Sequence, residues 1–355
     1  MKIISFPIVC FIFLGWSHGI GAVLPSGVFT STLTYRGTYN NNLLNYSPRD
    51  RGLFFDRAEL HPSPIRSLDD WRTDLKLGAS YQTRFYRNLD TELQTTLDFA
   101  HHLMDPIKNF GWLSLSLRQE LGRGWDGSLA YFYEPEYYIR DYRDLHSREY
   151  HPCDFTLAHW TVRAGYRPNK NIQLFGQGRI KEYYYNGYFT EYDGNTTELN
   201  FGAALRMDPW RMSLSWGYSE FKNTGFNSLD RLPAGLILAD NEVGQADYAE
   251  NEYSASVSYN YYFFGRRARA AGDLSITNRY YATGRPPELD PVHAGRKDMV
   301  TATALSAKQY WTKRLAFELG WEYAVRDSKA DLPLASLLKD YYRWSCWLEM
   351  SYQLW

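Results

Sequence analysis

The sequence has few cysteines, no long internal apolar run and no excess of charge of one sign. One of its three cysteines, Cys10, lies in the apolar N-terminal stretch. The other two, Cys153 and Cys346, are too few for a disulfide framework and predict two free thiols. The formal net charge of -1 argues against a nucleic-acid-binding protein, which usually carries a basic excess.

Only the N-terminus is continuously apolar. Lys2 is followed by an apolar run over 3–16 and by small residues near Ala22. This order is typical of a secretory signal peptide, with an uncleaved anchor helix as the alternative. The predicted organisation is therefore a signal peptide at 1–22 and one domain at 23–355. No internal segment of that domain approaches the roughly 18 apolar residues that a membrane helix needs.

The sequence is rich in aromatic residues, 17% of the chain, and they follow a period of two. Alternate side chains of a strand point to opposite faces, so this period predicts strands with one apolar and one polar face. Each predicted strand is longer than the roughly 5–6 residues usual in soluble proteins. Fourteen are predicted, at 28–38, 72–86, 90–102, 110–121, 126–139, 154–167, 171–184, 196–208, 210–222, 251–264, 267–281, 298–311, 314–327 and 341–355. No amphipathic helix is predicted in the domain.

Short and long connections alternate between these strands. The short ones carry turn residues, as in "RNLD" at 87–90 and "PNK" at 168–170. This alternation is typical of an antiparallel transmembrane β-barrel, with tight turns at one end and long loops at the other. A soluble β-sandwich is the alternative, but its strands would be shorter. We therefore predict an all-β, up-and-down barrel of about 14 strands.

In such a barrel the apolar set of each strand faces lipid and the other set faces the lumen. Charged lumen residues either select solutes by their field or pair with one another and fill the barrel. The candidate lumen and selectivity residues are Arg163, Arg179, Lys181, Arg206, Arg211, Glu318, Glu322, Arg343 and Glu349. Aromatic residues near strand ends are expected to form interfacial girdles. The candidates for the girdle and for barrel assembly are Trp216, Trp321, Tyr323, Trp344, Tyr352 and Trp355.

The C-terminal stretch "LEMSYQLW" resembles the signature of Gram-negative outer-membrane barrel proteins. In that family the last residue is usually Phe or Trp, in phase with the lipid-facing set. Here Leu354 is in phase and Trp355 lies one residue beyond. The resemblance implies a place in the cell outer membrane, with lipid and the barrel assembly machinery as partners. The chain looks porin-like, and 296–328 and 339–355 are similar in style to barrels of polysaccharide exporters and surface-lipoprotein translocators.

Two long connections are candidate functional segments. Segments 39–71 and 223–250 are expected either to fold inward as a constriction or to serve as surface docking sites, and "LPAGLIL" at 232–238 favours packing. The tyrosine-rich segments 133–144 and 182–195 have two interpretations. They are either sugar-stacking surfaces or, more simply, the outer girdle continuing into the loops.

Signals for an enzyme or a metal site are weak. His159 lies within a strand without a nucleophile motif, and His101 and His102 are adjacent, so they point apart on a strand. We expect no cofactor and no enzymatic activity. The predicted function is a channel for passive diffusion or export of small hydrophilic or anionic solutes, saccharides among the candidates. One alternative is a non-conducting scaffold that holds a periplasmic or surface partner, such as a lipoprotein, a cytochrome or a secretion component. A lipid-modifying enzyme is the third interpretation.

Overall fold

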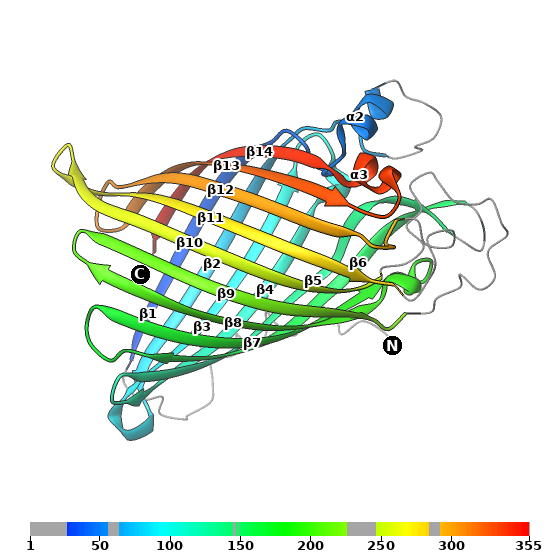
Figure 1. Ribbon diagram of the computed structural model, residues 1–355. Helices are drawn as coiled ribbons and strands as arrows, with labels where there is room; N and C mark the ends of the chain where they lie inside the picture. The colour runs from blue at the N-terminus through cyan, green and yellow to red at the C-terminus, as the bar shows by residue number, and fades with distance from the viewer. Residues whose placement is uncertain are drawn as a thin grey trace, which may run out of the picture.

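The computed structural model describes residues 27–55, 64–144, 147, 149–225, 246–283 and 292–354. They form one closed antiparallel barrel in which each strand pairs with its sequence neighbours and β1 pairs with β14 (Figure 1). The strands are β1 (Val28–Asn40), β2 (Asp70–Arg84), β3 (Asp90–His102), β4 (Phe110–Gly122), β5 (Trp125–Arg143), β6 (Tyr150–Tyr166), β7 (Ile172–Tyr185), β8 (Gly194–Met207), β9 (Trp210–Asn223), β10 (Asp247–Phe263), β11 (Arg266–Ala282), β12 (Lys297–Tyr310), β13 (Leu315–Lys329) and β14 (Tyr341–Gln353). The predicted fold and strand map are confirmed.

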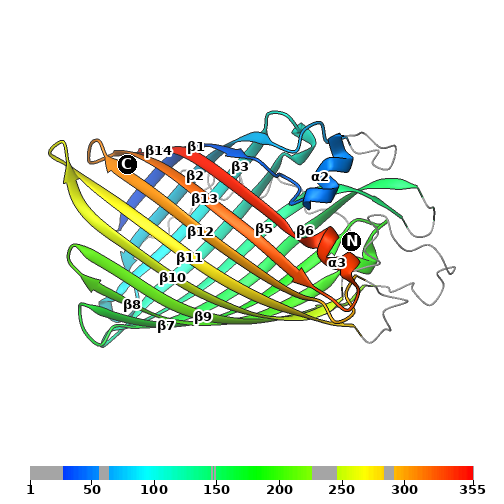
Figure 2. The same cartoon turned by 45° about the horizontal axis from the view of Figure 1, so that its top comes forward.

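The connections sort into two ends of the barrel. Tight turns join β2 to β3 and every second pair after it, and the longer connections lie at the opposite end (Figure 2). We call these the turn side and the loop side. Among the described residues, no helix is both long and apolar enough to cross a membrane.

The structure differs from the prediction on the loop side. Two short helices, α2 (Pro48–Phe55) and α3 (Pro333–Lys339), lie in connections for which no helix was predicted. The face of α2 is not clearly apolar, so helical periodicity could not reveal it. Strands β5 and β6 also extend further than expected, through two register shifts in their pairing. These bulges shorten the predicted 140–153 connection.

The outer wall is apolar. On β9, for example, Met212, Leu214 and Trp216 are exposed, and Leu214 retains 67% of its accessible surface. The intervening residues Ser213 and Ser215 instead bond across the inner face to serines of β10. So many large apolar side chains on the outside of a closed sheet would be unfavourable in water, whereas lipid would cover them. The described chain is therefore a transmembrane barrel.

The first and last strands close the sheet. Their register pairs Arg36 with Glu349, and Arg36 Nε donates to Glu349 Oε2 at 2.8 Å inside the barrel. Closure leaves no unpaired edge for lipid to meet. The two predicted free thiols are also confirmed, because Cys153 on β6 and Cys346 on β14 form no disulfide.

Candidate functional site

The candidate site is the lumen, and one sector of its wall carries small hydroxyl side chains. Strand alternation turns these residues inward, and pairs of them meet across the sheet. Ser213 and Ser256 lie 2.6 Å apart (Oγ–Oγ), and Ser215 and Ser254 lie 2.5 Å apart. A cavity of about 410 Å³ lies against this sector and extends to Asp273 and Glu322. We call this sector the hydroxyl wall and define it by Ser213, Ser254, Ser256 and Ser275, which line the cavity, and by Ser215, which bonds to Ser254.

Charged residues occupy the neighbouring sector nearer the loop side. Arg179 Nη1 donates to Glu198 Oε2 at 3.1 Å, and Lys181 forms an ion pair with the same carboxylate. Further around the wall, Arg279 Nε donates to Glu250 Oε2 at 2.8 Å. We call these five residues the charged band. A cavity of about 320 Å³ lies against its Arg179, Lys181, Glu198 and Glu250 side chains.

Other predicted lumen residues are also paired. Arg343 Nη2 lies 2.9 Å from Glu322 Oε1, and Lys308 Nζ lies 3.4 Å from Glu318 Oε2. Glu349 on β14 accepts a hydrogen bond from Arg36 on the neighbouring strand β1. The predicted lumen carboxylates Glu318, Glu322 and Glu349 are therefore each partnered by a base. The sequence left two interpretations of the lumen charges open, solute selection and pairing with one another. These groups are paired.

Of the remaining basic candidates, Arg163 borders the charged band, because Thr161, two residues before it on β6, accepts from Arg179 Nε at 3.1 Å. The Arg163 guanidinium lies 4.5 Å from the centroid of the Phe175 ring. Arg206 and Arg211 are register partners and are exposed beside the turn between β8 and β9. The structure thus places Arg163 beside Arg179 on the neighbouring strand but does not gather Arg206 and Arg211 with Arg179 and Lys181. Their role in selectivity stays a prediction.

A cluster of tyrosines lies inside the barrel near the loop side. They come from β5, β7, β10 and the turn η3 (Thr190–Tyr192), and they line a cavity of about 160 Å³ with Phe221 and Ile139. We call this the tyrosine pocket and define it by Tyr142, Tyr183, Tyr185, Tyr192 and Tyr248. For these tyrosines the simpler girdle interpretation is wrong. The girdle lies on the lipid face, whereas these rings share the inner face with Arg179 and Lys181.

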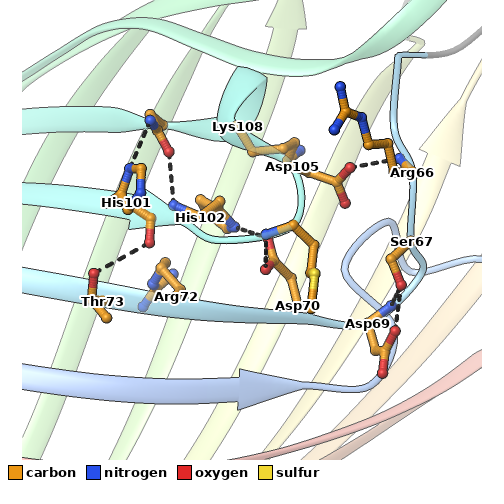
Figure 3. A network of polar contacts seen from close by, with 12 residues as sticks. Arg66, Ser67, Asp69, Asp70, Arg72, Thr73, His101, His102, Asp105 and Lys108 are labelled. Atoms are coloured by element: carbon orange, nitrogen blue, oxygen red, sulfur yellow. Dashed lines mark hydrogen bonds and ion pairs between the residues drawn. The ribbon is translucent and has the colours of Figure 1, made fainter.

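A polar network fastens the loop-side connections to the wall (Figure 3). Asp70, at the start of β2, accepts from the backbone N–H of Met104 at 2.9 Å, and its other oxygen lies 2.9 Å from His102 Nδ1. Asp105 accepts from the backbone N–H of Arg66 at 2.6 Å. Parts of the 41–69 and 103–109 connections are therefore held together at the loop-side ends of β2 and β3.

Lys108 extends this network to β5. It ends the turn η2 (Pro106–Lys108), and its buried ammonium group donates to the carbonyl oxygens of Tyr138 and Ile139 at 3.0 and 2.9 Å. Burial, with a contribution from nearby Arg140, lowers the pKa of Lys108 to about 8. The sequence analysis missed this residue, since a lysine in a predicted loop is expected to be solvated.

The predicted girdle residues that the structure describes face outward, but they lie at different positions along the barrel axis. Tyr352 lies near the turn end of β14, and Trp344 packs near its loop end with Tyr39 at 5.2 Å between ring centroids. Trp216, Trp321 and Tyr323 lie at the centres of their strands. An interfacial role stays a prediction for the first pair, whereas the mid-strand residues face the hydrocarbon region. Trp355 lies outside the described residues.

The histidines and acidic residues that the structure describes do not form a metal centre. No group of three or more His, Cys, Asp or Glu residues that could hold a metal ion occurs in the described part of the chain. His159 stacks on Phe132, with 4.7 Å between ring centroids and 7° between planes, which is a packing contact. The predicted apolar piece 232–238, with most of the 223–250 connection, lies outside the described ranges. Its proposed inward packing therefore stays a prediction.

Comparisons with known proteins agree on the fold. No family model matches the sequence, and no curated protein matches it. Among solved structures, the chain is similar to a bacterial polysaccharide outer-membrane secretin, at 8% identity and a TM-score of 0.47 over 92% of this chain and 98% of that one. It is also similar to an anion-selective porin from Comamonas acidovorans, at 9% identity and a TM-score of 0.44 over 93% and 99%. The outer-membrane protein OmpT of Vibrio cholerae matches at 8% and 0.47 over 92% and 99%.

The barrel itself follows from the strand pairing and the apolar outer wall, without help from these distant likenesses. The barrel fold that the resemblance implies is confirmed by the closed strand pairing and the exposed apolar wall. The chain is a transmembrane β-barrel. Such low identities and scores carry no conclusion about what this barrel transports.

Proposed function

We propose that this outer-membrane barrel is a porin-like channel for passive diffusion or export of small hydrophilic solutes, anions and saccharides among them. The observation that carries the proposal is the hydroxyl wall with its cavity of about 410 Å³. A barrel of 14 strands encloses more space than the eight-stranded barrels whose interiors side chains fill. Small hydroxyl side chains leave this space to water and offer hydrogen bonds to solutes.

In this proposal the charged band is the filter. Arg179, Lys181 and Glu198 place charges of both signs at one height in the lumen. A solute passing them meets a local transverse field, so its charge and dipole affect its passage. The channel works without a catalytic step or a cofactor.

The targeting of the chain is proposed on the same footing. Residues 1–22 would direct export and be removed, leaving 23–355 for the barrel assembly machinery to insert into a Gram-negative outer membrane. The mass of the protein isolated from membranes tests this. A mass that includes residues 1–22 would contradict removal.

The test of the channel is single-channel conductance of the purified protein in a planar bilayer. We expect steady open steps, and a reversal potential under a salt gradient that shifts when Arg179 and Lys181 are both changed to Gln. Absence of conductance from a folded, heat-modifiable barrel would contradict an open pore. That result would favour the scaffold alternative, in which a partner protein occupies the lumen.

A further inference from the structure

We propose that the tyrosine pocket binds a neutral pyranose ring of a saccharide as it passes through the lumen. This inference rests on the proposed channel function, because it places the site on the solute's path. The inward row of β7 joins the two regions directly: Arg179 and Lys181 belong to the charged band, and Tyr183 and Tyr185 follow them into the pocket. A solute that leaves the band towards the loop side therefore meets tyrosine rings next.

The chemistry of the lining suits a sugar. A pyranose ring has an apolar C–H face and a rim of hydroxyl groups, so it needs both an aromatic surface and hydrogen-bonding partners. Tyrosine supplies an apolar ring and a hydroxyl group that both donates and accepts. The ring centroids of Tyr142 and Tyr192 lie 5.8 Å apart, with 18° between the ring planes. The ring centroid of Tyr185 lies 5.4 Å from that of Tyr192. Among the described residues, those that line the cavity of about 160 Å³ carry no charged side chain.

The pocket is also held rigid from behind. Phe189 and Cys153 are fully buried and pack with Tyr192, and Tyr142 and Tyr185 pack against that group. The backbone N–H of Tyr192 donates to the Phe189 carbonyl at 3.0 Å, and that of Tyr185 donates to Asp193 Oδ1 at 2.6 Å. Rings fixed in this way lose little freedom when a ligand arrives, which favours binding.

Two arginines border the pocket, and the Arg140 guanidinium lies 4.6 Å from the centroid of the Tyr142 ring. The Arg279 guanidinium lies 4.2 Å from the centroid of the Tyr248 ring, on the border of the pocket. Its charge is already neutralised by Glu250, whose carboxylate accepts from Arg279 Nε at 2.8 Å. An anionic sugar would find no free base among the lining residues and would lose its hydration. The geometry therefore points to uncharged hexose units.

The experiment uses maltotriose as the neutral probe, trigalacturonic acid as an anionic probe of similar length and benzyl alcohol as a small aromatic probe. Calorimetric binding to the folded full-length barrel in detergent is measured first, and block of the single-channel current second. Tyr248→Leu removes one ring of the pocket. Tyr253→Leu is the matched control, because Tyr253 lies on the same strand and faces outward with 52% of its surface exposed.

We expect saturable binding of maltotriose, weakened about tenfold by Tyr248→Leu, or about 1.4 kcal/mol, and unchanged by Tyr253→Leu. If Tyr248→Leu does not fold, Tyr185→Phe removes a hydroxyl group while keeping the ring, and it is expected to weaken binding less. No saturable binding of maltotriose, or preferential binding of either other probe, would overturn the proposal. Equal losses in Tyr253→Leu would overturn it as well.

The two measurements separate this inference from the channel function. Maltotriose binding by a barrel that never conducts would contradict the channel and support the pocket. A conducting barrel whose current and calorimetry ignore maltotriose would contradict the pocket and support the channel.

Discussion

The two halves of the lumen are built differently. On the hydroxyl wall, serines bond to one another and leave an open space of about 410 Å³ beside them. Towards the loop side, tyrosine rings and paired charges project inward, and the space beside the rings is about 160 Å³. Strand β10 contributes to both regions, with Ser254 and Ser256 on the hydroxyl wall and Tyr248 in the tyrosine pocket. The difference shows that side-chain size along a strand, rather than strand number alone, sets where a pore is wide and where it contacts a solute.

The largest expected effect comes from filling the wide region. Ser256→Trp would project an indole into the space beside the hydroxyl wall, and we expect it to reduce single-channel conductance by more than half. Val257→Trp is the control, because Val257 is the next residue of β10 and faces outward with 40% of its surface exposed. Equal conductance in both variants would show that the hydroxyl wall does not line the conducting path.

The next effect concerns ion selectivity in the charged band. Glu198→Gln leaves Arg179 and Lys181 without their shared carboxylate, so we expect the reversal potential to shift towards anions. Changing both bases to Gln leaves Glu198 unpaired and is expected to shift it towards cations. Glu220→Gln, on the outward face of β9, serves as the control. Shifts of the same sign in both lumen variants would rule out this band as the filter.

A smaller effect is expected on the stability of the barrel when Lys108, on the loop side, is changed. Lys108→Met removes the donor to the Tyr138 and Ile139 carbonyls. A buried polar group left without a partner costs about 1–3 kcal/mol, so the free energy of unfolding should fall by about that amount. Urea unfolding of the folded barrel in detergent measures this change. Lys170→Met, in an exposed turn, is the control and should leave the unfolding free energy unchanged.

The smallest predicted effect is a dependence on pH. The pKa of Lys108 is about 8 in the folded barrel, below the ordinary lysine value of 10.5. Between these values the unfolded chain binds more protons than the folded one, so stability rises with pH. The Lys108 contribution is about 1 kcal/mol from pH 8 to 9. The wild type should show this gain relative to Lys108→Met, and parallel pH profiles of the two would contradict the buried-ammonium assignment.

The sequence was sufficient for the barrel, since a lipid-facing strand must keep its period of two over its full length. Strands such as 90–102 match the structure at both ends. The tyrosine pocket could not be predicted in this way. Tyr183 and Tyr248 belong to β7 and β10, and their proximity depends on the registers of the two strands between them. Tyr142 lies beyond register shifts that no local pattern specifies.

The charged band was predictable in part. The alternation places Arg179 and Lys181 on the inner face, as expected, but it does not show which acid they meet. Glu198 reaches them because the 185–194 connection sets the β7–β8 register, pairing Arg179 with Glu198. Lys108 gave no signal, because a single lysine in a loop looks the same whether solvated or buried.

The seam between β1 and β14 has a consequence for biogenesis. The Arg36–Glu349 contact joins residues from opposite ends of the chain, so it forms only after the last strand has been synthesised. Without β14, β1 and β13 would each present a row of unpaired backbone groups that the hydrocarbon region cannot satisfy. A chain that ends before β14 would therefore have two sheet edges with unpaired backbone N–H and C=O groups. We expect such a product to be degraded instead of forming a narrower, working pore.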